Sequence, residues 1–196
     1  MAARGGVEWF QSTAVWFLSP EYGVFQTVGE HNRAPSAGPG SAWASALVLA
    51  GFIGVCFIAG GIAGAVTDPN ISAWYDGLKH APGTPPNWVF PVVWSCQYVL
   101  IGIAAWLVWK QPADRRALRP WFANLVFNFL WSPAFFGLHS PGLGLVAIVP
   151  LLATIVLTIR AFARVRPLAA WLMVPYLVWG AYATYLNVGF FYLNPS

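Results

Sequence analysis

The sequence has few charged side chains and lacks the motifs of most enzyme classes. Only 8% of its 196 residues are charged, whereas about a quarter are charged in an average soluble domain. No phosphate-binding glycine loop, dinucleotide fingerprint, catalytic triad or Cys/His metal spacing occurs. We therefore predict no metal site. The two cysteines, Cys56 and Cys96, lie inside apolar runs, where buried thiols are more typical of packing than of a disulfide.

The scarce charges also restrict the possible partners. The net charge of +4 comes from Lys and Arg residues in tails and connections between apolar runs, without interleaved aromatics, so we expect no nucleic acid as a partner. The apolar runs contain no Asp, Glu, Lys or Arg, which argues against a proton or ion pump. The three histidines, His31, His80 and His139, fall in tails or loops, where a solvated role is expected.

Hydrophobic side chains are abundant instead. They make up 58% of the chain, and aromatic residues alone make up 17%. Five apolar runs can each cross a hydrocarbon core of about 30 Å: residues 43–66, 88–109, 120–138, 143–159 and 168–193. The sequence thus predicts an all-α fold, an integral membrane bundle of five transmembrane helices in residues 42–196. Residues 1–41 end in a run rich in Pro, Gly and Ser and are predicted to be a poorly ordered N-terminal extension.

Proline marks the ends and interruptions of these runs. Asp68-Pro69 predicts the end of the first helix, followed by a short helix from Ile71 to Lys79 capped by Asn70. Prolines 82, 85 and 86 stiffen the loop before the second run, so that this loop can serve as a lid. Ser132-Pro133 interrupts the third run.

Orientation follows from the positive charges in the connections. With the N-terminus inside, nine of the ten Lys and Arg residues lie on the cytoplasmic side, and Lys79 alone lies outside. We predict a multi-pass protein with a cytoplasmic N-terminus and an external C-terminus. The basic connection at residues 110–119 is expected to meet anionic headgroups of the lipid bilayer.

Aromatic rings gather where the polar loop meets the second run. Trp74, Trp88, Trp94 and Tyr98 can anchor the chain at the membrane boundary or line a cleft for a flat ligand. A stripe of rings at helical spacing is more often core than ligand site, so a binding claim requires several rings to converge.

Residues four apart lie on one helix face. This places Trp94 with Tyr98 and Gly102, and it places Trp179 with Ala183 and Asn187. Asn124 and Asn128 also share a face, and an amide in lipid must find a partner, which predicts interhelical hydrogen bonds.

Three separated motifs resemble one membrane-protein family. They comprise Trp74-Tyr75, Leu78, Pro85 to Phe90, Trp94 and Tyr98; then Asn128 to Pro133 with Phe135 to Gly137; then Pro175 to Trp179 with Ala183 to Asn187. In this order they resemble the translocator protein family, also called tryptophan-rich sensory proteins or peripheral benzodiazepine receptors (TspO/MBR). The resemblance covers roughly residues 42–193.

The resemblance implies a five-helix bundle that forms a homodimer and binds tetrapyrroles, with protoporphyrin IX or haem as ligand and no cofactor required. The ligand-binding residues that it implies are Trp74, Asp76, Trp88, Phe90, Trp94, Tyr98, Asn128, Trp131, Trp179, Ala183, Leu186 and Asn187. Two positions depart from the family pattern. The lid has Gly83 where relatives carry Trp, and the sterol-recognition segment has Val188 and Tyr192 in place of Tyr and a basic residue. Sterol is therefore expected to be a weak partner.

Three functions follow as hypotheses. The first is a membrane receptor or carrier, a sensor or transporter, that binds tetrapyrroles and similar flat hydrophobic ligands in an aromatic cavity on the side of the first loop. The second is a light- and oxygen-dependent enzyme that degrades protoporphyrin, with Trp94 and Trp179 as catalytic residues. The third is a structural membrane protein without a small ligand, whose Trp residues serve as anchors.

Overall fold

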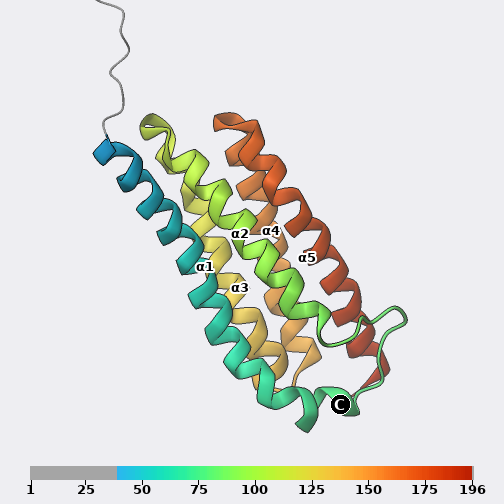
Figure 1. Cartoon of the computed structure of the whole chain (residues 1–196). Coiled ribbons are helices and arrows are strands. Elements are labelled where there is room, and N and C mark those ends of the chain that lie inside the picture. Colours follow the sequence, from blue (N-terminus) through green and yellow to red (C-terminus); the bar gives the residue numbers. More distant parts are fainter. Residues whose placement is uncertain (1–38, 196) are drawn as a thin grey trace, which may run out of the picture. The chain divides into compact units, whose positions relative to one another are not determined.

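The computed structural model describes residues 39–195, which are mostly helical and contain no strand. Five α-helices run side by side in alternating directions (Figure 1): α1 Pro39–Ala73, α2 Val89–Trp109, α3 Arg119–Ser132, α4 Pro141–Val165 and α5 Pro167–Leu193. The predicted all-α bundle of five helices is confirmed. By length and composition α1, α2 and α4 are long and apolar enough to cross a membrane. The predicted N-terminal extension lies outside the described residues, apart from 39–41, which begin α1.

The helices form a closed ring in the order α1, α2, α5, α4, α3, since each contacts its two neighbours in that order. Most of the fully buried large side chains lie in the half of the bundle next to residues 110–119, which we call the basic half. They include Trp121, Phe162 and Met173. The opposite half adjoins the loop of residues 78–88, and we call it the loop half.

Proline lies at the start of several of these helices. Pro120, Pro141 and Pro167 occupy the first turns of α3, α4 and α5, where the missing N–H would have no intrahelical partner. At α4 the hydroxyl of Ser140 also accepts a hydrogen bond from the backbone N–H of Leu143 at 3.2 Å. The α4 helix extends to Val165, beyond the predicted end at Ile159, because the long Arg160 and Arg164 side chains can continue an apolar helix at its end.

The predicted break at Asp68-Pro69 is wrong. The α1 helix continues through Pro69 to Ala73, and Asn70 lies inside it instead of capping a new helix. Side chains on either side of the proline hold this turn: Thr67 Oγ1 donates to the Ala63 carbonyl at 3.0 Å, and Asn70 Nδ2 donates to the Val66 carbonyl at 2.7 Å. A proline removes only one backbone donor, and such side-chain bonds offset the loss.

The predicted short helix from Ile71 to Lys79 shrinks to the single 3-10 turn η1, Tyr75–Gly77. A second 3-10 segment, η2 (Pro112–Leu118), connects α2 to α3. The interruption predicted at Ser132-Pro133 is confirmed in another form, because the chain passes into the π-helical turn η3, Pro133–Gly137, without leaving the bundle.

The loop of residues 78–88 is fastened to the end of α5. Asn194 accepts from the Lys79 backbone N–H at 2.8 Å and donates to the Lys79 carbonyl at 3.0 Å. Tyr182 and Tyr185 donate to the carbonyls of Gly83 and Pro82, at 2.6 and 3.0 Å. The loop is therefore held in place over the loop half of the bundle.

Candidate functional site

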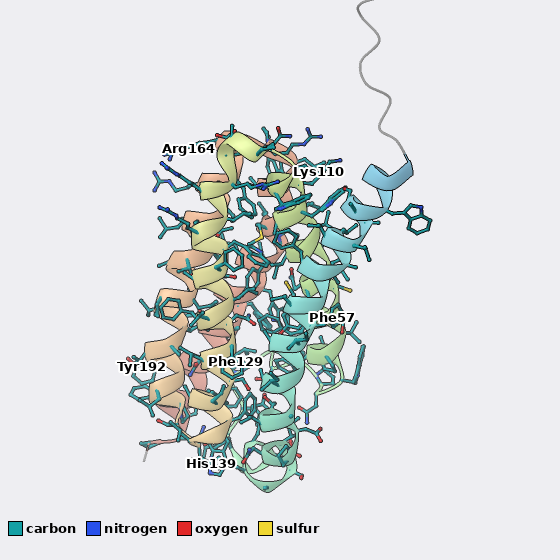
Figure 2. The ribbon with its side chains drawn as sticks, turned by 90° about the vertical axis from the view of Figure 1, so that its left-hand side faces the viewer. Phe57, Lys110, Phe129, His139, Arg164 and Tyr192 are labelled. Atoms are coloured by element: carbon teal, nitrogen blue, oxygen red, sulfur yellow. The ribbon has the colours of Figure 1, made fainter. Side chains whose placement is uncertain are left out.

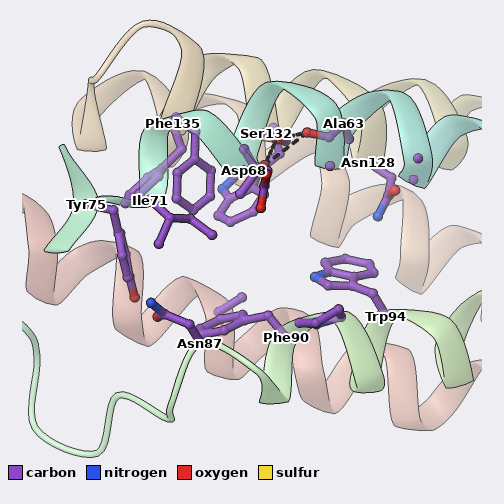
Figure 3. Close-up of a pocket in the computed structure, with 18 of the residues that line it drawn as sticks. Ala63, Asp68, Ile71, Tyr75, Asn87, Phe90, Trp94, Asn128, Ser132 and Phe135 are labelled. Carbon is purple, nitrogen blue, oxygen red and sulfur yellow. Dashed lines mark hydrogen bonds between the residues drawn. The ribbon is translucent and has the colours of Figure 1, made fainter. Parts of the chain in front are cut away.

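A cavity of about 540 Å³ lies in the loop half. Its walls come from α1, α2, α3 with η3, and α5, together with Tyr75 of η1 and Asn87 of the loop. Figure 3 shows Phe90 and Trp94 of α2 on one side and Ala63 and Asp68 of α1 on the other, with open space between them. No single helix forms this site.

Aromatic rings form two of the cavity walls. On α2, Trp94 stacks on Tyr98 with ring centroids 5.5 Å apart and meets Tyr176 of α5 edge-on at 6.0 Å. On α3 and η3, Trp131 stacks on Phe135 at 5.6 Å. Because each ring is held by another, the walls present flat apolar faces in fixed positions.

Three of the eight residues that α1 contributes to the cavity wall are glycines, Gly60, Gly61 and Gly64. A Cβ atom added at Gly60 would collide with the ring of Tyr98, whereas one added at Gly61 or Gly64 would meet nothing within 4 Å. All three glycines line the cavity. The absence of side chains at Gly61 and Gly64 leaves space opposite the rings.

The amides near the cavity are engaged in bonds between helices. Asn128 Nδ2 donates to the Tyr176 hydroxyl at 2.7 Å. The indole N–H of Trp131 donates to Asn187 Oδ1 at 3.2 Å, and Asn187 Nδ2 donates to the Pro141 carbonyl at 2.8 Å. Together with the bond from Asn124 Nδ2 to Thr154 Oγ1 at 3.4 Å, these contacts confirm the predicted interhelical hydrogen bonds. They fix the walls before any ligand binds.

Charge is sparse around the cavity. Among the described residues that line it, Asp68 is the one charged side chain. Tyr75, which also lines the cavity, is buried, and burial raises the pKa of its phenol to about 12, with smaller contributions from the negative charges of Asp76 and, when ionised, Tyr182. The Tyr75 hydroxyl is therefore neutral at physiological pH.

The structure brings eight of the twelve expected ligand-binding residues together around this cavity. They are Phe90, Trp94, Tyr98, Asn128, Trp131, Ala183, Leu186 and Asn187. The other four, Trp74, Asp76, Trp88 and Trp179, lie outside its lining.

The four outlying residues have other contacts or are exposed. Trp74 stacks on His139 with ring centroids 4.9 Å apart. Asp76 accepts a hydrogen bond at 3.2 Å from Asn87, which does line the cavity. Trp88 is 67% exposed. Trp179 meets Phe90 edge-on at 5.8 Å and lines a separate groove on the outside of α2 and α5.

Sequence reasoning missed most of the α1 wall and several rings. These additional lining residues include Phe57, Gly60, Gly61, Ala63, Gly64, Thr67, Asp68, Ile71, Tyr75, Phe135, Phe136 and Phe190. The four-residue spacing of Gly60 and Gly64 was a usable signal, because it marks a face of α1 without bulk. The pair Phe135-Phe136 lies in the second motif but was not included in the expected site.

Comparison with known proteins identifies one family and several relatives of this chain. The family described as the TspO/MBR family matches residues 52–193. The chain is 42% identical over 154 residues to the tryptophan-rich protein TspO of Chlorobaculum tepidum, covering 76% of this chain and 97% of that protein. It is 39% identical over 137 residues to the protein of the same name from Archaeoglobus fulgidus, covering 68% and 89%. The human translocator protein is 37% identical over 119 residues, covering 58% and 70%.

Proposed function

Because the chain belongs to the TspO/MBR family, we propose that its cavity binds a tetrapyrrole such as protoporphyrin IX or haem, or a similar flat hydrophobic molecule, and that the protein is a membrane receptor or carrier for it. The names of its relatives, a tryptophan-rich sensory protein and translocator proteins, are consistent with such a role. The cavity volume of about 540 Å³ falls within the range typical of small-molecule sites, roughly 300–1,000 Å³.

The observation that carries this proposal is the pairing of fixed rings with an open glycine face. Trp94 and Trp131 offer flat surfaces, while Gly61 and Gly64 add no bulk opposite them. A wide, thin aromatic ligand can stack on the rings and fill this space. A structural role alone would not require a hollow between helices that are closely packed elsewhere.

Asp68 gives the proposal a testable orientation. Its carboxylate lies at the cavity and would repel the propionates of a porphyrin, so the apolar edge of the ligand should face α1 at this point. We expect Asp68→Asn to bind protoporphyrin IX several-fold more tightly at low salt, with a smaller gain at high salt. Equal affinity of the parent protein and the Asp68→Asn variant at low salt would show that Asp68 does not orient the ligand.

The test of the proposal is a titration of the purified protein with protoporphyrin IX in the dark, in which binding is measured as quenching of Trp fluorescence. We expect saturable quenching, with affinity about fivefold weaker for Trp94→Ala, because a stacked aromatic pair contributes about 1 kcal/mol beyond its buried area. Trp171→Ala is the matched control, since Trp171 is 71% exposed on α5 in the basic half. Absence of quenching, or equal losses in both variants, would favour the structural role.

A second candidate function is the light-dependent degradation of protoporphyrin. One arrangement favours it: Trp94 lines the cavity and contacts both Tyr98 and Tyr176, so that oxidisable rings adjoin the proposed ligand. Trp179 is separated from the cavity by Phe90. We expect Trp94→Phe to retain dark affinity and to lose light-driven porphyrin loss in the presence of oxygen, and Trp179→Phe to change neither. Porphyrin loss that needs only Trp179 would contradict this assignment.

We also propose the predicted orientation in the membrane. Seven of the eight Lys and Arg residues in the described chain lie near the ends of α2 to α5 in the basic half, and Lys79 alone lies in the loop half. Figure 2 shows Lys110 and Arg164 at one end of the bundle and His139 at the other. The positive-inside rule would place the basic half in the cytoplasm. Reporter fusions after Arg116 and at Ser196 should then read cytoplasmic and external, and a common side for both would contradict the proposal.

A further inference from the structure

We propose a second ligand site in the groove between α2 and α5, on the outside of the bundle, which takes a membrane-soluble molecule with an apolar body and one hydroxyl group. The groove has a volume of about 490 Å³ and is distinct from the main cavity. The residues that line it are Gln97 of α2 and Val174, Pro175, Val178, Trp179 and Tyr182 of α5.

Two buried polar atoms belonging to groove residues have no hydrogen-bond partner within the described part of the chain. One is Oε1 of Gln97, a residue that is only 5% exposed, and the other is Nε1 of Trp179. The first is an acceptor and the second a donor. Buried polar groups in native proteins are nearly always paired, and an unpaired one in an apolar setting is costly. Two such atoms, on residues of α2 and α5 that line the same groove, indicate a missing polar partner.

A hydroxyl group satisfies both atoms at once. Its O–H can donate to Gln97 Oε1 while its oxygen accepts from the indole N–H of Trp179. A carboxylate would supply no donor, and a hydrocarbon would leave both atoms unpaired. The hydroxyl would also suit the Gln97 amide in its flipped orientation, because it can accept as well as donate.

The rest of the groove favours an apolar body. Val174, Pro175 and Val178 contribute only hydrocarbon side chains, and Val178 is 64% exposed on the outside of the bundle. The hydroxyl of Tyr182 is already used, since it donates to the Gly83 carbonyl at 2.6 Å. The polar end of the ligand is thus assigned to Gln97 and Trp179, and its body to the aliphatic surface of α5.

A ring contact separates the two sites. Phe90 lines the main cavity, Trp179 lines the groove, and the two rings meet edge-on at 5.8 Å with an angle of 69° between their planes. Occupants of the two sites would therefore lie on opposite sides of this pair. The groove can be tested independently of tetrapyrrole binding.

The experiment follows the indole N–H signals of the full chain, labelled with ¹⁵N-Trp in detergent micelles, during titration with 1-decanol or with decane. Comparison with Trp179→Phe identifies the Trp179 signal among those of the 12 tryptophans. We expect a saturable shift of the Trp179 signal with decanol and none with decane at equal concentration. No shift with decanol, or the same shift with decane, would overturn the proposal.

Variants show whether Gln97 supplies the second contact. Gln97→Leu should weaken decanol binding about tenfold, as expected for the loss of one hydrogen bond in a buried setting, while dark affinity for protoporphyrin IX stays unchanged. Gln97→Met serves the same purpose if the leucine variant is unstable. Ala183→Leu, which fills the main cavity, should leave the decanol response intact. Unchanged decanol affinity in a folded Gln97 variant would overturn the proposal.

Discussion

The basic half and the loop half of the bundle use the same five helices and differ in how those helices meet. In the basic half, Trp121, Phe162 and Met173 are fully buried, and Ala104 and Ala105 allow close contact between helices. In the loop half, the helices surround a cavity of about 540 Å³. Overall apolarity is therefore a poor guide to packing in this chain. The sizes of the side chains that face each other decide whether the helices enclose a solid core or a hollow.

Glycine illustrates this difference most clearly. At Gly102, in the basic half, an added Cβ would lie 2.8 Å from Cα of Ile53, so the glycine permits α1 and α2 to approach closely. At Gly64, in the loop half, an added Cβ would meet nothing within 4 Å. Glycine thus permits close packing of two helices at Gly102 and leaves open space beside the helix at Gly64.

The largest effect on stability should come from the solid core. Phe162→Ala should lower the free energy of unfolding by about 3–5 kcal/mol, because the ring is fully buried and its loss leaves a void. Phe90→Ala, at the wall of the existing cavity, should cost less than half as much but weaken porphyrin binding. Thermal unfolding in detergent and the dark titration measure the two quantities. Equal destabilisation by both variants would remove the distinction between the halves.

Tyr75 should make the loop half sensitive to high pH. Because burial raises the pKa of its phenol from 10.0 to about 12, the neutral form is favoured in the folded state. This contribution to the free energy of unfolding is fully present below pH 10 and is lost as the pH rises through about 12, a change of about 3 kcal/mol for a shift of two pKa units. Tyr75→Phe should remove that part of the pH dependence and remain stable at pH 8. If the stability of Tyr75→Phe fell between pH 9 and 12 by as much as that of the parent protein, the assignment to Tyr75 would be contradicted.

Glycine substitutions should sharpen the comparison further. Gly102→Ala should destabilise the bundle by about 1–2 kcal/mol, because its Cβ would press on the backbone of Ile53. Gly51→Ala is the control within α1, since a Cβ there meets nothing within 4 Å and alanine favours the helix. Melting temperatures of both variants test the pair. If Gly51→Ala destabilised the protein by a similar amount, Gly51 would have to make a contact that is absent from the single chain of this structure.

The smallest effect concerns the attachment of the loop. Asn194→Ala removes two hydrogen bonds to the Lys79 backbone and should cost about 1 kcal/mol, with faster hydrogen exchange at the Lys79 amide. Lys79→Ala keeps those backbone bonds and should leave the exchange rate of residue 79 close to that of the parent protein once the sequence effect on intrinsic exchange is corrected. Equal exchange in both variants would show that Asn194 does not hold the loop.

The sequence predicted the helices well because their apolar runs are long and separated by charged or proline-rich connections. It failed at Asp68-Pro69, where the local rule for a helix end was overridden by side-chain bonds from Thr67 and Asn70. The hydrogen-bonding requirement of an apolar environment is not visible in the dipeptide itself.

The site was predicted only in part for a geometric reason. Residues four apart advance by about 40° more than one full turn, so Trp179 and Asn187 differ by about 80° around α5. Ala183 and Asn187 consequently line the cavity, whereas Trp179 lines the outer groove. The spacing of Gly60 and Gly64 marks a face of α1 without bulk, but it does not say which helix packs opposite that face, so the α1 wall of the cavity could not be assigned from it.

The most direct test of the hollow loop half compares dark protoporphyrin IX affinity in Ala183→Leu and Trp109→Phe. Ala183 lines the cavity, whereas Trp109 lies at the end of α2 in the basic half, under the guanidinium of Arg115. We predict that Ala183→Leu weakens binding at least tenfold, because its added bulk costs more than about 1.4 kcal/mol in a filled site. Trp109→Phe should bind like the parent protein. Equal losses in the two variants, or full affinity in Ala183→Leu, would contradict the placement of the site.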